Sequence, residues 1–339
     1  MKAAVYVGPG SVELRDWPTP SAGPGELLLK VGGCGLCGSD IGKILSGELP
    51  PPVVFGHEVV GTVVEAGRGV PEFKEGDRLV VAHHVPCFTC HYCRRGSPSM
   101  CRAFKTVNLD PGGFAEYVRV PAPNVRHAAF RVPEALSDEA ASFTEPLACC
   151  LRAVKRAKVE PGDTALVVGL GSIGCLFVQL LRRAGLSVLA SDQDQRRLAL
   201  GRSFGALSFM EPAALGEAVA EATEGRGVDT VVVTAGGGSV FSWATSLVRD
   251  GGVFHFFAGG EGESLPLGVL YRRELTLTAT YSSSPAELGE AFDLLVRGAI
   301  VPDRLITHRL PLHRLADGVA MMVGREAVKV FMVPEGGAL

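Results

Sequence analysis

The second half of the chain alternates short apolar runs with segments of helical character. Residues 165–168 are continuously apolar, which is typical of a strand buried on both faces of a sheet. Residues 175–184 have helical character and stop at Gly185, a residue that commonly ends a helix. A second apolar run follows at residues 188–190. This succession of strand, helix and strand predicts an α/β region.

The rest of the chain divides into two patterns. Residues 1–33 alternate apolar segments with Gly/Pro turns, and the turn at Pro24 and Gly25 leads into an apolar run. We expect an irregular, mostly antiparallel β region here, with strands at 27–31, 53–64 and 78–82. The α/β pattern resumes beyond residue 192. We expect helices at 196–204, 213–223 and 285–297, and strands at 228–234, 252–258, 275–281 and 328–333.

Composition narrows the class of protein. The 339 residues suggest about two domains, and the apolar fraction of 47% permits a large core. Thirty-six acidic against 33 basic residues leave a net charge of −3, so no basic surface for nucleic acid is expected. No run of 18 apolar residues predicts a membrane span, and the amino terminus lacks a signal-peptide pattern. We therefore expect a cytoplasmic protein whose nine cysteines stay reduced, as metal ligands or core residues.

A glycine-rich turn follows the first apolar run of the α/β region. Gly169, Gly171 and Gly174 fit the pattern Gly-x-Gly-x-x-Gly, with Ser172 and Ile173 between the last two. The first glycine allows a tight turn, the second lets the backbone approach a pyrophosphate, and the third lets the helix lie close to the strand. The sequence predicts a dinucleotide site here. The alternative is a plain strand-to-helix turn.

An acid marks the end of the next strand. Asp192 lies 18 residues after Gly174, where a carboxylate accepts hydrogen bonds from an adenosine ribose. That carboxylate would repel a 2′-phosphate, so NAD is favoured over NADP. Arg196 and Arg197 could soften the preference, or could simply be the solvated start of a helix.

Later strand ends supply further candidates for cofactor contact. Glycines there permit the close approach of a flat cofactor. Contact with nicotinamide or ribose is expected at Thr234, Ala235, Ala258 and Gly259, although ordinary turns would give the same pattern.

Four cysteines form a compact pattern in the first half of the chain. Cys87, Cys90, Cys93 and Cys101 are separated by two, two and seven residues. In a reducing compartment this spacing indicates a tetrahedral thiolate site, and zinc fits it better than an iron–sulfur cluster or disulfides. The bacterial ferredoxin run differs, because its last gap has three residues and its last cysteine precedes proline.

A second set of candidate ligands is spread more widely. Cys37 and the pair His57 and Glu58 supply a thiolate, an imidazole and a carboxylate, which zinc accepts when one position stays open for substrate. From spacing alone this set is only suggestive, because a single Cys or His is more often a core residue. His83 and His84 have no partner at ligand spacing and are interpreted as structural or surface residues.

Together these motifs resemble the zinc-dependent alcohol and polyol dehydrogenases of the medium-chain dehydrogenase/reductase superfamily, especially the sorbitol, threonine and glucose dehydrogenases. The resemblance covers the whole chain and follows the family order. It rests on residues 35–40, 56–58, the four cysteines, 113–117, 145–148 and the turn at Gly169.

The resemblance implies the fold and its division. A mostly β, GroES-like catalytic domain is expected at residues 1–148, with a structural-zinc lobe at 84–103. A Rossmann domain with a doubly wound parallel sheet is expected at 149–284. Residues 285–339 would return to the catalytic domain.

It also implies roles for individual residues. Cys37 and His57 match ligands of a catalytic zinc. Glu58 matches either a further ligand or an acid that contacts the ligands, and Glu145 matches an acid that binds the metal directly or through water. Ser39 matches the hydroxyl that takes the substrate's proton, although it could instead cap the following helix. The four cysteines match ligands of a second, structural zinc.

The chain departs from the family at one position. Many relatives have a histidine at the end of the proton relay where this chain has Gly42, followed by Lys43. Water or a ribose hydroxyl would then complete the relay. The implied enzyme moves hydride between NAD and a secondary alcohol of a polyol, sugar, aminocyclitol or amino-hydroxy acid.

Two other functions remain open from the sequence, and assembly rests on analogy. The alternatives are an NADPH-dependent reductase of the same superfamily and a dinucleotide-binding protein without catalysis. Relatives are commonly tetramers, so a homo-oligomer, either tetramer or dimer, is expected.

Overall fold

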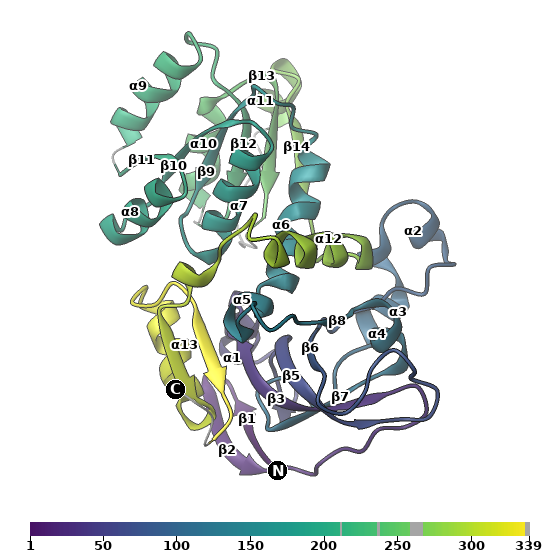
Figure 1. Cartoon of the computed structure of the whole chain (residues 1–339). Coiled ribbons are helices and arrows are strands. Elements are labelled where there is room, and N and C mark those ends of the chain that lie inside the picture. Colours follow the sequence, from purple (N-terminus) through teal and green to yellow (C-terminus); the bar gives the residue numbers. More distant parts are fainter. Residues whose placement is uncertain (211, 236–237, 258–266, 336–339) are drawn as a thin grey trace. The chain divides into compact units, whose positions relative to one another are not determined.

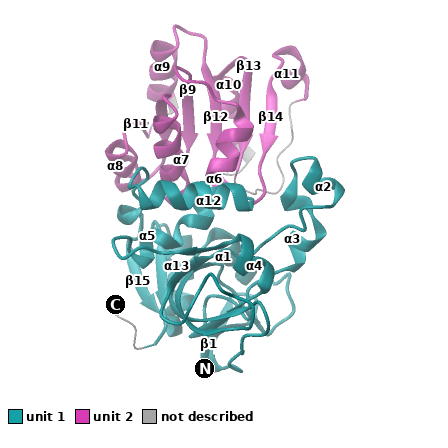
Figure 2. Cartoon of the chain, turned by 45° about the vertical axis from the view of Figure 1, so that its right-hand side comes forward, with its two compact units in different colours: residues 1–148, 283–339 teal, residues 149–282 magenta. Residues whose placement is uncertain are grey.

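The chain forms two compact units in a computed structural model (Figure 1). Residues 1–148 and 283–339 make up unit 1, and residues 149–282 make up unit 2 (Figure 2). The structure describes residues 1–210, 212–235, 238–257 and 267–335. None of the helices in these ranges is long and apolar enough to cross a membrane.

Unit 1 is built mainly from β-strands. Its strands are β1 (Lys2–Gly8), β2 (Ser11–Asp16), β3 (Leu27–Gly35), β4 (Val53–Val54), β5 (Glu58–Ala66), β6 (Arg78–Val81), β7 (Tyr117–Val120), β8 (Ala129–Arg131), β15 (His308–Pro311) and β16 (Val330–Val333). They form a small sheet in the order β2-β1-β4 and a larger one in the order β15-β16-β3-β5-β6-β8, with β7 also paired to β3. Only β15 and β16 pair in parallel among these strands.

Short helices connect these strands. They are α1 (Gly38–Ser46), α2 (His91–Arg94), α3 (Arg102–Thr106), α4 (Ala122–His127), α5 (Asp138–Ser142), α12 (Pro285–Val296) and α13 (Leu315–Val323), and α6 (Thr144–Ala157) begins in this unit. Alternate residues of β3 and β5 face a core that also takes residues from β16 and α13. The carboxyl-terminal segment is therefore part of the hydrophobic core of unit 1.

Unit 2 has a single parallel sheet with the strand order β11-β10-β9-β12-β13-β14. The strands are β9 (Thr164–Val168), β10 (Ser187–Ser191), β11 (Leu207–Phe209), β12 (Val228–Val233), β13 (Val248–Phe256) and β14 (Thr276–Ala279). The helices are α7 (Ser172–Arg183), α8 (Gln195–Ser203), α9 (Pro212–Ala222), α10 (Gly238–Leu247) and α11 (Leu267–Arg272). Numbered within this unit, the order is 3-2-1-4-5-6, that of a doubly wound dinucleotide-binding sheet.

The central strands explain this arrangement. Every residue of β9 and of β12 is buried, as expected for strands covered on both faces. Leu215 of α9 and Ala244 of α10 pack with Leu166 and Val231 on one face of the sheet. The predicted fold class, a doubly wound parallel sheet plus a mostly β domain, is confirmed.

One predicted strand is interrupted. The expected strand at 53–64 is split into β4 and β5, and Gly56 lies in the gap with a positive φ of 96°. A Cβ on Gly56 would come within 2.8 Å of the Phe114 backbone nitrogen, so only glycine fits this turn. The break matters because it places His57 at the entrance of β5.

Candidate active site and metal centres

The pairing of β3 with β5 brings Cys37 and His57 together. Gly35, at the end of β3, lies opposite Glu58, at the start of the antiparallel strand β5. The chain continues from Gly35 to Cys37 and reaches back from Glu58 to His57, so both side chains extend from the same end of the sheet. A Cβ on Gly35 would come within 2.0 Å of the Glu58 carboxylate. Glycine is therefore required where the two strands approach.

Three of the predicted catalytic-zinc residues form one cluster. The Cys37 sulfur, a His57 ring nitrogen and a Glu58 carboxylate oxygen all lie within 4.8 Å of one another. His57 and Glu58 are buried, and Cys37 is partly exposed. A thiolate, an imidazole and a carboxylate suit zinc, and partial exposure of one ligand leaves a route for substrate.

Asp40 orients the cluster, a role that the sequence did not reveal. Its carboxylate lies 3.1 Å from Nδ1 of His57 and accepts a hydrogen bond of 3.2 Å from the Cys37 backbone N–H. With Nδ1 bonded to Asp40, the His57 ring has Nε2 left for a metal, as in carboxylate–histidine–zinc arrangements. The available signal was an acid three residues after Cys37, where it caps α1.

Burial and charge have opposite effects on the pKa values of His57 and Asp40. Burial would lower the pKa of His57, but the charges of Asp40 and Cys37 and hydrogen bonds to them raise it well above its usual range. Burial would raise the pKa of Asp40, but the His57 charge and hydrogen bond hold it below its usual range. The carboxylate is thus kept as an acceptor for the imidazole.

Lys329 is a second partner that sequence reasoning missed. Its Nζ lies 2.6 Å from each Glu58 carboxylate oxygen, and both side chains are almost fully buried. Burial would lower the pKa of Lys329, but the Glu58 charge raises it above its usual value. The pair forms because β16 places Phe331 opposite Gly35, which brings the preceding residues to the level of Cys37. Only the tertiary pairing of the carboxyl-terminal strand reveals this contact.

Glu145 and Ser39 occupy different places around the cluster. Glu145 is buried at the start of α6 and lines a narrow internal gap together with Glu58 and Thr144. It does not belong to the set of ligand atoms within 4.8 Å of one another. Ser39 is exposed, and its hydroxyl donates to the Cys37 sulfur at 3.4 Å.

The alternative role of Ser39 as a helix cap is wrong. The residue that caps α1 is Cys37, whose side chain accepts from the N–H of Asp40. Ser39 lies inside the helix, and its hydroxyl turns back to the thiol. The helix begins at Gly38, two residues earlier than a cap at Ser39 would require, and this explains the difference.

The four cysteines form the second cluster. The four sulfur atoms all lie within 4.8 Å of one another, and they belong to Cys87, Cys90, Cys93 and Cys101. The Cys90 and Cys93 sulfurs are 3.5 Å apart, and those of Cys87 and Cys101 are 3.6 Å apart. Four mutually close thiols without a disulfide fit a closed tetrahedral zinc site.

Hydrogen bonds from nearby backbone groups favour the thiolate form of Cys87 in this lobe. The pKa of Cys87 is lowered to about 6. The largest cause is a hydrogen bond from the backbone N–H of Thr89, and the next is a hydrogen bond from the Thr89 hydroxyl. A lowered pKa favours the thiolate, which is the form that binds metal. The helices α2 and α3 that carry or follow these cysteines lie at an outlying part of unit 1 (Figure 1).

Three imidazole rings connect the two clusters. The ring centroid of His83 lies 4.6 Å from that of His57 and 3.7 Å from that of His84. His84 lies 4.9 Å from Phe104 of α3 and donates from Nδ1 to the Val107 carbonyl at 2.8 Å. Sequence reasoning missed this row. Counting outward from the antiparallel pair Val59 and Val81 would have placed His57 and His83 side by side.

The glycine turn of unit 2 leaves room where a pyrophosphate would lie. A Cβ on Gly169 would come within 2.6 Å of Ala235, and one on Gly174 within 1.8 Å of the Gly169 carbonyl oxygen. A Cβ on Gly171 would meet only Arg197, at 3.9 Å. Two glycines therefore serve packing, while the third keeps the backbone open at the amino terminus of α7, which begins with Ser172 and Ile173.

Asp192 is held beside this turn. Its carboxylate accepts hydrogen bonds from the backbone N–H groups of Leu170 at 2.7 Å and Asp194 at 2.9 Å. A carboxylate has further lone pairs for the hydroxyls of a ribose. Arg196 forms an ion pair with Asp194 at 2.7 Å.

The structure describes two of the four remaining residues that are predicted to contact the cofactor, Thr234 and Ala235. The Thr234 hydroxyl donates to the carbonyl oxygens of Val168 and Gly169, at 3.0 and 2.9 Å, so it braces the turn. Ala235 packs against Gly169. Ala258 and Gly259 lie outside the described residues.

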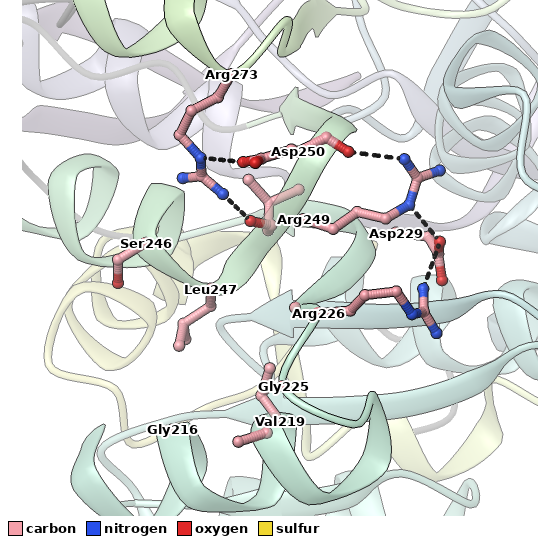
Figure 3. Close-up of a pocket in the computed structure, with 13 residues that line it drawn as sticks. Gly216, Val219, Gly225, Arg226, Asp229, Ser246, Leu247, Arg249, Asp250 and Arg273 are labelled. Atoms are coloured by element: carbon pink, nitrogen blue, oxygen red, sulfur yellow. Dashed lines mark hydrogen bonds and ion pairs between the residues drawn. The ribbon is translucent and has the colours of Figure 1, made fainter.

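A hollow of about 990 Å³ lies away from these residues (Figure 3). It opens at the amino ends of β12 and β13, whereas the glycine turn follows the carboxyl end of β9. Its charges are largely paired with one another: Arg249 bonds Asp229 at 2.6 Å, and Arg273 bonds Asp250 at 2.7 Å. Figure 3 shows these ion pairs along the rim of the hollow. We interpret the network as bracing of the strand ends.

Comparison with known proteins defines the class. Residues 23–133 match the alcohol dehydrogenase GroES-like domain, and residues 172–297 match the zinc-binding dehydrogenase domain. The chain belongs to the family of zinc-binding alcohol dehydrogenases. The enzyme class predicted from the sequence, a zinc-dependent alcohol or polyol dehydrogenase, is therefore confirmed.

Individual relatives cover nearly the whole chain. The sorbitol dehydrogenase of Bacillus subtilis (strain 168) is 28% identical and covers 98% of this chain and 97% of its own length. The D-arabitol-phosphate dehydrogenase of Enterococcus avium is 31% identical, with coverage of 98% and 97%. A structure from Sinorhizobium meliloti 1021, determined with NADP bound, is 34% identical, with coverage of 98% and 99% and a TM-score of 0.86.

Proposed function

We propose that the chain transfers hydride between NAD and a secondary alcohol of a polyol, sugar, aminocyclitol or amino-hydroxy acid. The observation that carries the proposal is the cluster of Cys37, His57 and Glu58, whose ligand atoms lie within 4.8 Å of one another in a zinc-binding alcohol dehydrogenase. The relatives named for sorbitol and D-arabitol phosphate support a polyhydroxylated substrate.

The residues around the cluster fit a catalytic zinc. When bound, zinc supplies a Lewis acid that makes an alcohol easier to deprotonate. Cys37 and His57 would hold it, and Asp40 would keep the His57 ring in the orientation that presents Nε2. Lys329 neutralises Glu58 in the buried wall, so Glu58 is suited to a position beside the metal. Glu145 is the further carboxylate proposed to bind directly or through water.

Ser39 is proposed to receive the substrate's proton. Its hydroxyl is exposed on α1 and lies 3.4 Å from the Cys37 sulfur, next to the proposed metal position. At Gly42, where many relatives carry a histidine, a Cβ would meet nothing within 4 Å. This open space supports water as the group that takes the proton onward.

The four-cysteine lobe is proposed to hold a second zinc. Its four sulfurs all lie within 4.8 Å of one another, which fits four thiolate ligands around one metal. Such a site contributes folding free energy and takes no part in chemistry. Two zinc ions per chain follow from this proposal.

NAD is proposed as the preferred cofactor. Asp192 presents a carboxylate beside the glycine turn, and Arg196 is paired with Asp194. A 2′-phosphate would meet negative charge there. The S. meliloti relative holds NADP, so the preference of this chain needs its own test.

The Asp192→Ala variant tests that preference. Loss of the carboxylate removes the repulsion of a 2′-phosphate and the hydrogen bonds to the ribose, so the ratio of kcat/KM for NADP to that for NAD should rise by about tenfold or more. Asp163→Asn is a matched control, because Asp163 lies before β9, away from the glycine turn. An unchanged ratio in Asp192→Ala would remove Asp192 from the ribose site.

A substrate screen distinguishes the functions considered. Zinc-loaded protein is mixed with polyols, sugars and amino-hydroxy acids, and NADH and NADPH formation are followed by absorbance. Turnover of a polyol with NAD supports the proposal. Zinc-free turnover with NADPH would favour the reductase, and cofactor binding without turnover of any substrate would favour a non-catalytic protein.

A cytoplasmic homo-oligomer, a dimer or a tetramer, is also proposed. None of the nine cysteines forms a disulfide bond, as expected in a reducing compartment. In the edge strand β14 of unit 2 and helix α11, Leu267, Tyr271 and Leu277 are exposed. An exposed strand edge beside apolar side chains favours association. Light scattering coupled to gel filtration gives the mass, and a monomer across the micromolar range would contradict the proposal.

A further inference from the structure

Two side chains that carry N–H donors, Lys43 and His83, lie near the ligand cluster but do not belong to its set of ligand atoms. Lys43 lies one turn after Ser39 on α1, and residues four apart share a helix face. Its side chain therefore projects from the same face as the hydroxyl proposed to take the proton. The His83 ring lies 4.6 Å from the His57 ring.

The space beside α1 is open. Cβ atoms built on Gly38 and Gly42 would meet nothing within 4 Å. Ser39 and Lys43 are both exposed on the same helix. A substrate whose alcohol oxygen reaches Cys37 and His57 would therefore have room to extend along this helix.

The charges nearby leave Lys43 without a partner. Asp40 is matched by His57 at 3.1 Å, and Glu58 by Lys329 at 2.6 Å. Within the described part of the chain, Lys43 forms no ion pair.

His83 also has unused hydrogen-bonding capacity. Its Nδ1 is buried, and no described residue bonds it. His84, by contrast, is fixed by the Val107 carbonyl and by Phe104. The Nδ1 of His83 is closed off from solvent, so Nε2, to which no hydrogen bond is found within the described residues, is the ring nitrogen left for another group.

We propose that Lys43 and His83 form a subsite for an acidic substituent of the substrate, a carboxylate or a phosphate, carried beyond the alcohol carbon. This inference rests on the proposed function and narrows its substrate class. An ammonium and an imidazole N–H supply charge-assisted hydrogen bonds to such oxygens. A neutral polyol would bind the same metal position but would leave Lys43 unused.

The test compares three substrates of one carbon chain. Zinc-loaded, full-length enzyme is assayed with D-sorbitol, D-gluconate and D-sorbitol 6-phosphate, using NAD and NADP. We expect one of the two acidic substrates to have a kcat/KM at least about tenfold above that of sorbitol, an advantage that falls at high salt. The pair of acids distinguishes a carboxylate from a phosphate.

Variants connect the effect to the two residues. Lys43→Gln should lower kcat/KM for the preferred acid by about 30-fold and that for sorbitol by less than about threefold. Lys43→Arg should retain most of the preference, because it keeps the charge. Lys74→Gln, at an exposed lysine in a turn, is the control and should change neither.

His83→Phe keeps a ring beside His57 but removes the nitrogens. It should lower kcat/KM for the preferred acid by about tenfold and leave the zinc content at the wild-type value. A smaller effect on sorbitol separates the subsite from a general disturbance of His57.

Binding of inorganic phosphate decides the matter if none of the three substrates is turned over. Calorimetry with zinc-loaded wild type should detect phosphate binding, weakened about tenfold in Lys43→Gln. The subsite would be overturned if Lys43→Gln lowered kcat/KM equally for sorbitol and for the acids. It would also be overturned if Lys43→Gln left the affinity for phosphate unchanged. Turnover of sorbitol with NAD in that case would leave the proposed function intact, whereas failure of every alcohol would count against the function itself.

Discussion

The two ligand clusters lie in the same unit but depend on the fold in different ways. Cys37, His57 and Glu58 are brought together by the pairing of β3 with β5, and Glu58 is neutralised by Lys329 from the other end of the chain. Cys87 and Cys101 belong to a single short segment with exposed parts, and the other two cysteines lie between them. The first cluster is thus a product of the folded sheet, while the second, if it holds the proposed zinc, would depend on that metal to fix its own loop.

The largest effect is expected for Cys37→Ser. Loss of the thiolate ligand should lower kcat by at least about 1000-fold, because the Lewis acid is no longer held. The sheet that supports the site does not depend on this ligand, so the melting temperature should stay close to the wild-type value. Steady-state kinetics and thermal unfolding are measured on the same preparation. Full activity in this variant would remove Cys37 from catalysis.

The corresponding change in the lobe should act on stability. Cys90→Ser should reduce the zinc content from two to one per chain and lower the melting temperature by roughly 5–10 °C, because a structural site contributes folding free energy. Metal analysis and calorimetry report both quantities. A variant that keeps two zinc ions and an unchanged melting temperature would show that the four thiols are not a structural site.

A smaller effect is expected from the group that orients His57. Asp40→Asn keeps an acceptor for the Cys37 N–H but weakens the bond to the imidazole, so zinc affinity should fall about 10- to 100-fold. Competition with a chromophoric chelator measures that affinity. Asp317→Asn, an exposed acid on α13, is the control. Equal affinities in wild type and Asp40→Asn would mean that the orientation of His57 is set elsewhere.

The smallest effect concerns the ring row between the clusters. Burial lowers the pKa of His84 to about 4, so below pH 6.5 the unfolded chain takes up a proton that the folded chain does not. Stability is therefore lost as the pH falls from 6.5 towards 4, and His84 should account for about 1–2 kcal/mol between pH 7 and 5.

His84→Gln removes that titration and keeps a hydrogen-bond donor. Its unfolding free energy, measured by urea titration at both pH values with zinc content monitored, should decline less than that of wild type by about 1 kcal/mol. Parallel declines in the two proteins would contradict the assignment.

The features that could be predicted from the sequence are those formed by residues close together in the chain. The glycine turn, the four cysteines and the strands of the parallel sheet are local patterns, and they predicted an α/β region beside a mostly β region. The GroES-like and Rossmann assignment came from the family resemblance. Asp40, Lys329 and His83 were missed for a common reason. Their contacts depend on strand register, since β3, β5, β6 and β16 must pair before these side chains meet the cluster. Of the three, only Asp40 had a local signal, as an acid at the third position of a helix.

The ion pair of Glu58 with Lys329 has a consequence for synthesis on the ribosome. Glu58 is translated early, and all of unit 2 is made before Lys329 emerges. During that interval a nascent chain carries a carboxylate that the finished protein keeps out of water only when neutralised. The Glu58–Lys329 pair, and with it this part of the wall beside Cys37 and His57, can therefore form only after the last strand has been made.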